Sequence, residues 1–369
     1  MSDEPDRVPL DQLTIVRCDA EQIKQTLRNH WPKWGQPRGF PIDTYLARGE
    51  RLRADQSFSK DDAHVTWGLV DRKNPSVLLS HCETFRRPAL ILPPGEKKPQ
   101  DATTYTMGAV FCPEINRGKG YGRHMLRLMH YVVGDPKGLP PFPKAWGEPP
   151  AERLGDARFS VLYSEIGNKF YSSCRVGDGP DSTEGWVEQR QDTRTWYLQP
   201  GGPIENNGLW EWLGRKDSIK LEHELSERFR QDLPNQGDPK KTRVAVLPTS
   251  VIDYHIFRFM EMFPDHPSPK FGCILPPDEN GRRPFFIYSA VGKHPDAPHT
   301  LEIMHAQQPV PWAAVRAAAV HHGVEKVKLW GGYTGWDKEE GGVKVEQNED
   351  CPSLANYGLG EVDWQFNDQ

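Results

Sequence analysis

The feature that most constrains this chain is a basic, glycine-rich run, RGKGYGR, at positions 117–123. The residues before it, 103–112, are rich in β-branched and aromatic side chains, which predicts a strand. After it, apolar residues recur at helical spacing over 125–133, which predicts an amphipathic helix. The N-terminus of a helix presents unpaired backbone N–H groups, and glycine lets a ligand approach the main chain closely. The run therefore predicts an anion site suited to phosphate.

The spacing of the glycines excludes two common nucleotide-binding loops. A dinucleotide fingerprint, G-x-G-x-x-G, would need a third glycine where Arg123 stands. A P-loop needs Ser or Thr after Gly-Lys, whereas Lys119 is followed by Gly120. The pattern that fits is Arg/Gln-x-x-Gly-x-Gly/Ala, through Arg117, Gly120 and Gly122. It resembles motif A, the pyrophosphate loop of the Gcn5-related N-acetyltransferase (GNAT) superfamily. The alternative is a glycine-rich turn with exposed basic residues.

Composition narrows the class of protein. The 369 residues include 46 Lys and Arg against 51 Asp and Glu, a net charge of −5, which argues against a general nucleic-acid binder. The sequence contains no apolar stretch of about 18 residues, so it predicts no membrane-spanning helix. The acidic N-terminal segment lacks the features of a secretory signal. Six scattered cysteines without a C-x-x-C pair predict reduced thiols in a cytoplasmic protein, with no zinc site.

The order of predicted elements indicates an α/β (α+β) fold in two domains, 1–200 and 201–369. The first domain is expected to hold strands at 13–16, 64–70, 76–85, 103–112 and 159–163, with helices at 20–29, 42–53, 125–133 and 166–173. The second is expected to hold strands at 244–247, 271–275, 284–290, 300–306 and 326–330, with helices at 215–232 and 311–322. Residues 134–150 are expected to be an exposed insertion, 201–207 a linker, and the tail from Gly331 irregular.

Two further stretches give a narrower resemblance. SHCETFRRPAL at 80–90 and LYSEIGNKFY at 162–171 resemble the fungal lysine N6-acetyltransferase family, strongly over 13–176 and loosely after that. The resemblance implies a GNAT domain, a mixed twisted sheet flanked by helices, and a C-terminal domain that helps to form the acceptor site. It also implies direct transfer of acetyl from acetyl-coenzyme A (acetyl-CoA) to the side-chain amine of free L-lysine.

The resemblance implies roles for three side chains. A lysine amine has a pKa near 10.4 in solution, so it must lose a proton before it attacks the thioester. Glu165 and Glu83 are the two candidates for the base, and either could act through a water or hold the substrate ammonium instead. The sequence does not rank them. Tyr171 is expected to donate a proton to the departing sulfur. No metal is expected.

The resemblance also implies a cofactor site along the predicted strand and the glycine run. A backbone N–H near Phe111 or Cys112 is expected to hold the thioester oxygen. Cys112 is not expected to be a nucleophile, because no His is evidently paired with it and direct transfer needs no covalent intermediate. The residues expected to contact acetyl-CoA are Val110, Phe111, Cys112, Arg117, Gly118, Lys119, Gly120, Tyr121, Gly122, Arg123 and Asn168.

Two other functions stay open at this point. The same chemistry could act on another amine, such as a polyamine, an intermediate of secondary metabolism or a protein lysine. A non-catalytic module that binds coenzyme A is the more distant alternative. The expected partner is a small-molecule amine, with no nucleic acid and no membrane.

Overall fold

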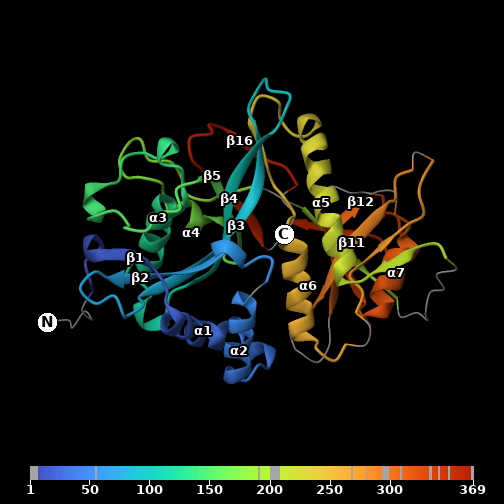
Figure 1. The fold of residues 1–369 in the computed structure, drawn as a ribbon, viewed down its shortest axis with the longest axis horizontal. Helices are drawn as coiled ribbons and strands as arrows, with labels where there is room; N and C mark the ends of the chain where they lie inside the picture. The colour runs from blue at the N-terminus through green and yellow to red at the C-terminus, as the bar shows by residue number, and fades with distance from the viewer. Residues whose placement is uncertain are drawn as a thin grey trace.

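The computed structural model describes residues 7–54, 56–189, 192–199, 208–266, 269–279, 281–292, 299–307, 310–331, 335–339, 341–347 and 350–366. They form two β-sheets, which lie side by side in Figure 1 with helices packed on them. The expected α/β class is confirmed by this arrangement. The predicted linker at 201–207 lies outside the described residues. Among the described helices, none combines enough length and apolar character to cross a membrane.

The first sheet has nine strands, in the order β1–β2–β3–β4–β5–β15–β6, with β9 paired to β3 and β16 paired to β9. Their bounds are β1 Leu13–Arg17, β2 His64–Asp71, β3 Ser80–Leu92, β4 Gln100–Phe111, β5 Ala157–Ser164, β6 Val187–Glu188, β9 Thr242–Val246, β15 Cys351–Asn356 and β16 Val362–Trp364. Strands β1 to β4 form an antiparallel meander, whereas β4 and β5 are parallel. A parallel pair needs a long crossover, which here contains a helix.

Helix α3 (Tyr121–Val133) provides this crossover and covers the first sheet. Its fully buried apolar residues recur at helical spacing and pack with side chains of β1, β2 and β4. The other helices of this half are α1 Ala20–Trp34, α2 Ile42–Arg53 and α4 Asn168–Ser172. Helix α1 begins after Asp19, whose side chain accepts from the Gln22 N–H while Gln22 bonds back to the Asp19 N–H. This capping box satisfies two N–H groups at the start of the helix.

The second sheet has seven strands, in the order β14–β7–β13–β12–β11–β10–β8. Their bounds are β7 Asp192–Tyr197, β8 Glu211–Leu213, β10 Gly272–Ile274, β11 Phe285–Val291, β12 Thr300–Gln307, β13 Lys326–Trp330 and β14 Lys344–Gln347. The helices of this half are α5 Arg215–Asp232, α6 Val251–Met262 and α7 Trp312–His321. Along β11, Phe285 and Ile287 pack with α6, and Phe286 and Tyr288 pack with α7. Because successive side chains of a strand point to opposite faces, β11 presents apolar side chains on both faces of this sheet, and a helix covers each face.

The chain crosses between the sheets, so the predicted boundary at residue 200 does not separate them. Strand β7, before the boundary, pairs with β13 and β14 of the second sheet. Strands β9, β15 and β16, after it, pair in the first sheet. Leu354 and Trp364 are buried there with Phe159 and Val161 of β5. Apolar contacts between distant segments therefore decide which sheet each strand joins.

Three local expectations need correction. The tail from Gly331 is not irregular, because it contains β14, β15 and β16. Helix α6 was not predicted, although its apolar residues prove to be buried. The segment 134–150 is not simply an exposed insertion, since Trp146 is buried against Tyr131 and Phe142.

The pairing of β15 predicts that the C-terminal strand stabilises the first sheet. Leu354 is 3% exposed. Leu354→Ala should lower the free energy of unfolding by about 3 kcal/mol, because it leaves a cavity beside β5. Urea denaturation measures this. Val345→Ala on β14, where the side chain is 46% exposed, is the control and should change stability by less than about 0.5 kcal/mol. Equal effects would contradict the role given to β15.

Candidate functional site

The first sheet opens where β4 and β5 stop pairing. The two strands are hydrogen-bonded from Thr103 opposite Ala157 to Thr106 opposite Val161. Beyond these residues the two strands no longer pair with each other, although β4 continues to Phe111 beside β3 and β5 continues to Ser164 beside β15. A cavity of about 420 Å³, which we call the β4–β5 cleft, lies there. Its walls are Lys33, Trp34, Met107, Gly108, Ala109, Val110, Phe111, Cys112, Arg117, Gly122, Leu162, Tyr163, Glu165, Ile166, Phe170 and Tyr171.

A β-bulge interrupts β4 inside this cleft. The register with β3 shifts between the pairs His81–Phe111 and Glu83–Gly108, so β4 carries one extra residue. Ala109 lies in the bulge with a φ of +47°, a left-handed conformation that non-glycine residues rarely adopt. A bulge leaves a residue unpaired in the ladder and redirects its backbone groups. The backbone around Ala109 and Val110 is therefore suited to hold a thioester oxygen, slightly earlier in β4 than the expected place near Phe111 or Cys112.

The glycine run forms the mouth of the cleft. Gly118 and Gly120 have φ values of +78° and +83°, which glycine adopts without steric cost. The first backbone N–H groups of α3 have no partner within the helix. Arg117 donates to the Cys112 carbonyl at 3.1 Å and pairs with Glu114 at 3.1 Å. Its guanidinium is thereby held at the rim of the cleft.

The remaining predicted cofactor residues take different positions. Lys119 is half-buried and Arg123 is exposed, both on the glycine run. The Tyr121 side chain lies in the core, where its hydroxyl accepts from the Val8 N–H at 2.9 Å, so only its backbone is placed to meet a ligand. Asn168, at the start of α4, donates to Glu188 at 2.6 Å and does not line the cleft.

Tyr171 lies in the wall of the cleft formed by α4. Its ring packs edge-on against Phe170, with the centroids 5.1 Å apart. Burial, together with the nearby Cys174 and Glu165, raises the pKa of Tyr171 well above its ordinary value. Among the described residues its hydroxyl has no hydrogen-bond partner. The hydroxyl therefore stays protonated and free to donate into the cleft.

A second cavity, of about 240 Å³, meets the cleft at the bulge. We call it the α1–α2 cavity. It is lined by Leu27, His30, Trp34, Arg38, Tyr45, Arg48, Gly49, Leu52, Arg53, Glu83, Ala109, Glu165, Tyr254 and Arg258. Trp34, Ala109 and Glu165 belong to the walls of both cavities. A molecule in one cavity can therefore approach a molecule in the other beside Ala109.

The structure brings both candidate carboxylates to this cavity but gives them different surroundings. Glu83 is buried and pairs with Arg53, and its Oε2 lies 3.1 Å from Nε2 of His64. Burial alone would raise the pKa of Glu83, but the charges of Arg53 and His64 outweigh it and hold the pKa well below its ordinary range. Glu165 is exposed and lines both cavities. Glu83 is thus a fixed negative charge, and Glu165 is the more accessible carboxylate.

The α1–α2 cavity also contains three arginines that no sequence pattern identified as site residues. Arg38, Arg48 and Arg258 pair with no carboxylate among the described residues. Burial and repulsion from Arg258 lower the pKa of Arg38, and they lower that of Arg48 to about 10. Arginine side chains carry a positive charge at neutral pH. Arg258 lies on α6, far along the chain from Arg38 and Arg48, so no local motif could have revealed that all three face one cavity.

Comparisons with known proteins agree with this geometry. The chain is 25% identical over 280 residues to a curated "Lysine acetyltransferase" of Yarrowia lipolytica, covering 69% of this chain and 68% of the relative. A GCN5-related N-acetyltransferase of Kribbella flavida has a similar structure, with a TM-score of 0.52, 13% identity, and 94% and 72% of the two chains covered. The corresponding enzyme of Anabaena variabilis gives a TM-score of 0.51, 11% identity, and 94% and 73% covered. No protein-family model matches the chain.

The chain has the fold of the GNAT acetyltransferases. Its resemblance to the lysine acetyltransferases is confirmed by the curated relative, and its expected fold by the solved structures. The curated relative and both structural neighbours are named as acetyltransferases. Among the described residues, no group of three or more His, Cys, Asp and Glu is arranged to hold a metal ion.

The glycine run predicts the effect of one substitution on cofactor binding. Gly120→Trp should abolish binding of acetyl-CoA, because the indole would occupy the turn that the pyrophosphate must approach. Isothermal titration calorimetry measures the binding, and circular dichroism checks the fold. Gly95→Trp is a matched control, since Gly95 has a similar φ of +81° with open space around it. If Gly120→Trp binds acetyl-CoA as the control does, the run is not the cofactor loop.

Proposed function

We propose that this GNAT enzyme transfers acetyl from acetyl-CoA to the side-chain amine of free L-lysine. The observation that carries the proposal is that the α1–α2 cavity is lined by both arginines and carboxylates. Arg38, Arg48 and Arg258 suit a carboxylate, and Glu83 and Glu165 suit an ammonium group. A polyamine carries only cations and would leave the arginines without a partner. A lysine within a protein has no free carboxylate. The name of the Yarrowia lipolytica relative, "Lysine acetyltransferase", supports a lysine amine as the acceptor.

The proposed reaction is a direct transfer between the two cavities. Glu165 removes a proton from the lysine ammonium, directly or through a water, and Glu83 holds positive charge nearby. The amine nitrogen then attacks the thioester carbon, so that an N–C bond forms and the C–S bond breaks. The backbone at the bulge stabilises the oxygen as it gains negative charge. Tyr171 gives its proton to the departing sulfur, and the second proton that the nitrogen loses as it becomes an amide restores the Tyr171 hydroxyl.

We also propose a reducing, cytoplasmic setting for this reaction. Cys18, Cys82, Cys112, Cys174 and Cys273 are free thiols. Burial raises the pKa of Cys18 and of Cys174 to about 12, so neither thiol is ionised at neutral pH. A thiol that stays protonated is a poor nucleophile. These cysteines therefore fit a protein that makes no use of disulfides.

The role of Tyr171 predicts a loss of turnover without a loss of binding. Tyr171→Phe should lower kcat about 100-fold, within the range for a general acid, and leave the affinity for acetyl-CoA nearly unchanged. A thiol-release assay measures kcat. Tyr131→Phe is the control, because Tyr131 is a buried tyrosine whose hydroxyl bonds to the Pro141 carbonyl outside the cleft. Unaltered kcat in Tyr171→Phe would show that Tyr171 only packs against Phe170.

The substrate is tested with a panel of amines, and products are identified by mass spectrometry. Lysine should gain one acetyl group on its side chain, and cadaverine, which is lysine without its carboxylate, should show a kcat/KM at least tenfold lower. A charge-assisted hydrogen bond of about 1.5–3 kcal/mol accounts for this difference. Arg48→Met should lower kcat/KM for lysine and leave kcat/KM for cadaverine unchanged.

Arg72→Met, a substitution of an exposed arginine outside the three cavities, is the control for this series. If cadaverine or another amine is turned over faster than lysine, that amine is the substrate, and the proposed acetyl transfer still holds. Binding of acetyl-CoA without turnover of any amine would instead favour a non-catalytic module.

A further inference from the structure

A third cavity, of about 250 Å³, lies between the two sheets, and its role is not explained by acetyl transfer to lysine. We call it the inter-sheet cavity. It is bounded by β3 and β4 on one side and by α6 and β12 on the other. It shares Met107 and Gly108 with the β4–β5 cleft and Tyr254 and Arg258 with the α1–α2 cavity. A ligand in it would therefore lie next to the bulge where the acyl group is expected.

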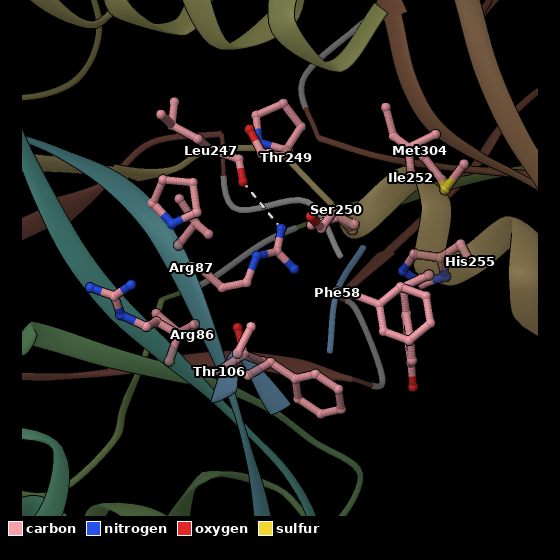
Figure 2. A pocket seen from close by; sticks show the side chains of 18 of the residues that line it. Phe58, Arg86, Arg87, Thr106, Leu247, Thr249, Ser250, Ile252, His255 and Met304 are labelled. Atoms are coloured by element: carbon pink, nitrogen blue, oxygen red, sulfur yellow. Dashed lines mark hydrogen bonds between the residues drawn. The ribbon is translucent and has the colours of Figure 1, made fainter. Parts of the chain in front are cut away.

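The charges that line this cavity are all of one sign. Arg86, Arg87 and Arg258 belong to its walls, and no Asp or Glu does among the described residues. Arg86 is neutralised by Asp156 at 3.0 Å, and Figure 2 shows its guanidinium turned away from Arg87. Figure 2 also shows Arg87 reaching into the middle of the cavity, where it donates to the Leu247 carbonyl at 3.1 Å. No carboxylate pairs with Arg87 among the described residues.

The surroundings of Arg87 do not cancel its charge. Burial lowers the pKa of Arg87 to about 10, which leaves it charged at neutral pH. Burial and the neighbouring Arg258 and Arg87 lower the pKa of His255 to about 3, so the imidazole is neutral. The carboxylate of Glu222 is nearby but accepts from the Asp253 N–H at 3.2 Å and caps α6. The guanidinium thus faces a cavity that holds no compensating anion.

The rest of the lining indicates what kind of anion would fit. The side chains of Thr249 and Ser250 lie near Arg87 in Figure 2 and offer hydroxyl groups. Phe58, Ile252 and Met304 form apolar walls farther along the cavity. A carboxylate could bond to the guanidinium and hydroxyls while an apolar chain extends along these walls. Lysine does not fit, because its ammonium groups would lie beside arginines with no acid in the walls.

We propose that the inter-sheet cavity is a carboxylate-binding site that takes a short apolar chain ending in a carboxylate. The carboxylate could come from two sources. It could be the distal end of an acyl group carried by coenzyme A, which the shared wall at Gly108 would allow, or it could belong to a free carboxylic acid. In the first case the reaction is unchanged: the C–S bond of the thioester breaks, an N–C bond forms with the amine, and the thiol leaves with a proton.

The binding test uses hexanoate as the probe and hexanamide as its neutral counterpart, titrated into the full-length protein by calorimetry. Hexanoate should bind to the wild type, and hexanamide should not. Arg87→Met should lower the affinity for hexanoate at least tenfold. Arg87→Lys, which keeps the charge, should weaken it less. Arg86→Met is the matched control from the same strand and should bind hexanoate like the wild type. Melting temperatures verify that each variant is folded.

The donor test compares glutaryl-CoA with hexanoyl-CoA, with whichever amine accepts acetyl. If the carboxylate belongs to the acyl group, Arg87→Met should reduce the ratio of kcat/KM for glutaryl-CoA over hexanoyl-CoA at least tenfold. If hexanoate binding depends on Arg87 but this ratio does not change, the ligand is a free acid.

The proposal is overturned if hexanoate binds no better than hexanamide, or binds Arg87→Met and Arg86→Met alike, and the donor ratio also stays the same. The calorimetry contains no amine, so its outcome does not depend on whether lysine is the acceptor.

Discussion

The separation of β4 from β5 beyond Thr106 and Val161 is the constraint on which the rest of the site depends. Two parallel strands that stop pairing leave backbone N–H and C=O groups that must find other partners. A coenzyme with amide groups along its chain can supply them. The bulge at Ala109, the glycine run and Tyr171 all border the same opening. The chemistry of the protein is therefore concentrated where its largest sheet is incomplete.

The three cavities that meet near this opening differ in charge, and we propose a different class of ligand for each. The β4–β5 cleft is entered past the backbone and arginine of the glycine run. The α1–α2 cavity combines arginines with Glu83 and Glu165. The inter-sheet cavity has arginines and apolar walls without any acid among the described residues. A coenzyme, an amino acid and an apolar carboxylate are the ligands that these three linings suit.

Helix α6 connects these cavities to the second sheet. Ile256 and Phe259 pack on β11, whereas Tyr254 and Arg258 line the α1–α2 and inter-sheet cavities. These two sets lie on different faces because residues three and four apart share one side of a helix. Asp253 strengthens the link by accepting from Ser57 at 2.5 Å and from Arg215 at 2.8 Å. The second half thus contributes side chains to the walls of the α1–α2 and inter-sheet cavities.

The sequence by itself determined the features that depend on neighbouring residues. The glycines at 118 and 120, the strand before them and the helix after them follow from local backbone preference and apolar spacing. Tyr171, Glu165 and Glu83 were also found from the sequence, through a resemblance, and the structure places all three around the bulge. Only the tertiary structure decided that Arg38, Arg48 and Arg258 face one cavity and that β15 returns to the first sheet. These contacts join distant segments, and they depend on how buried surfaces fit rather than on any local pattern.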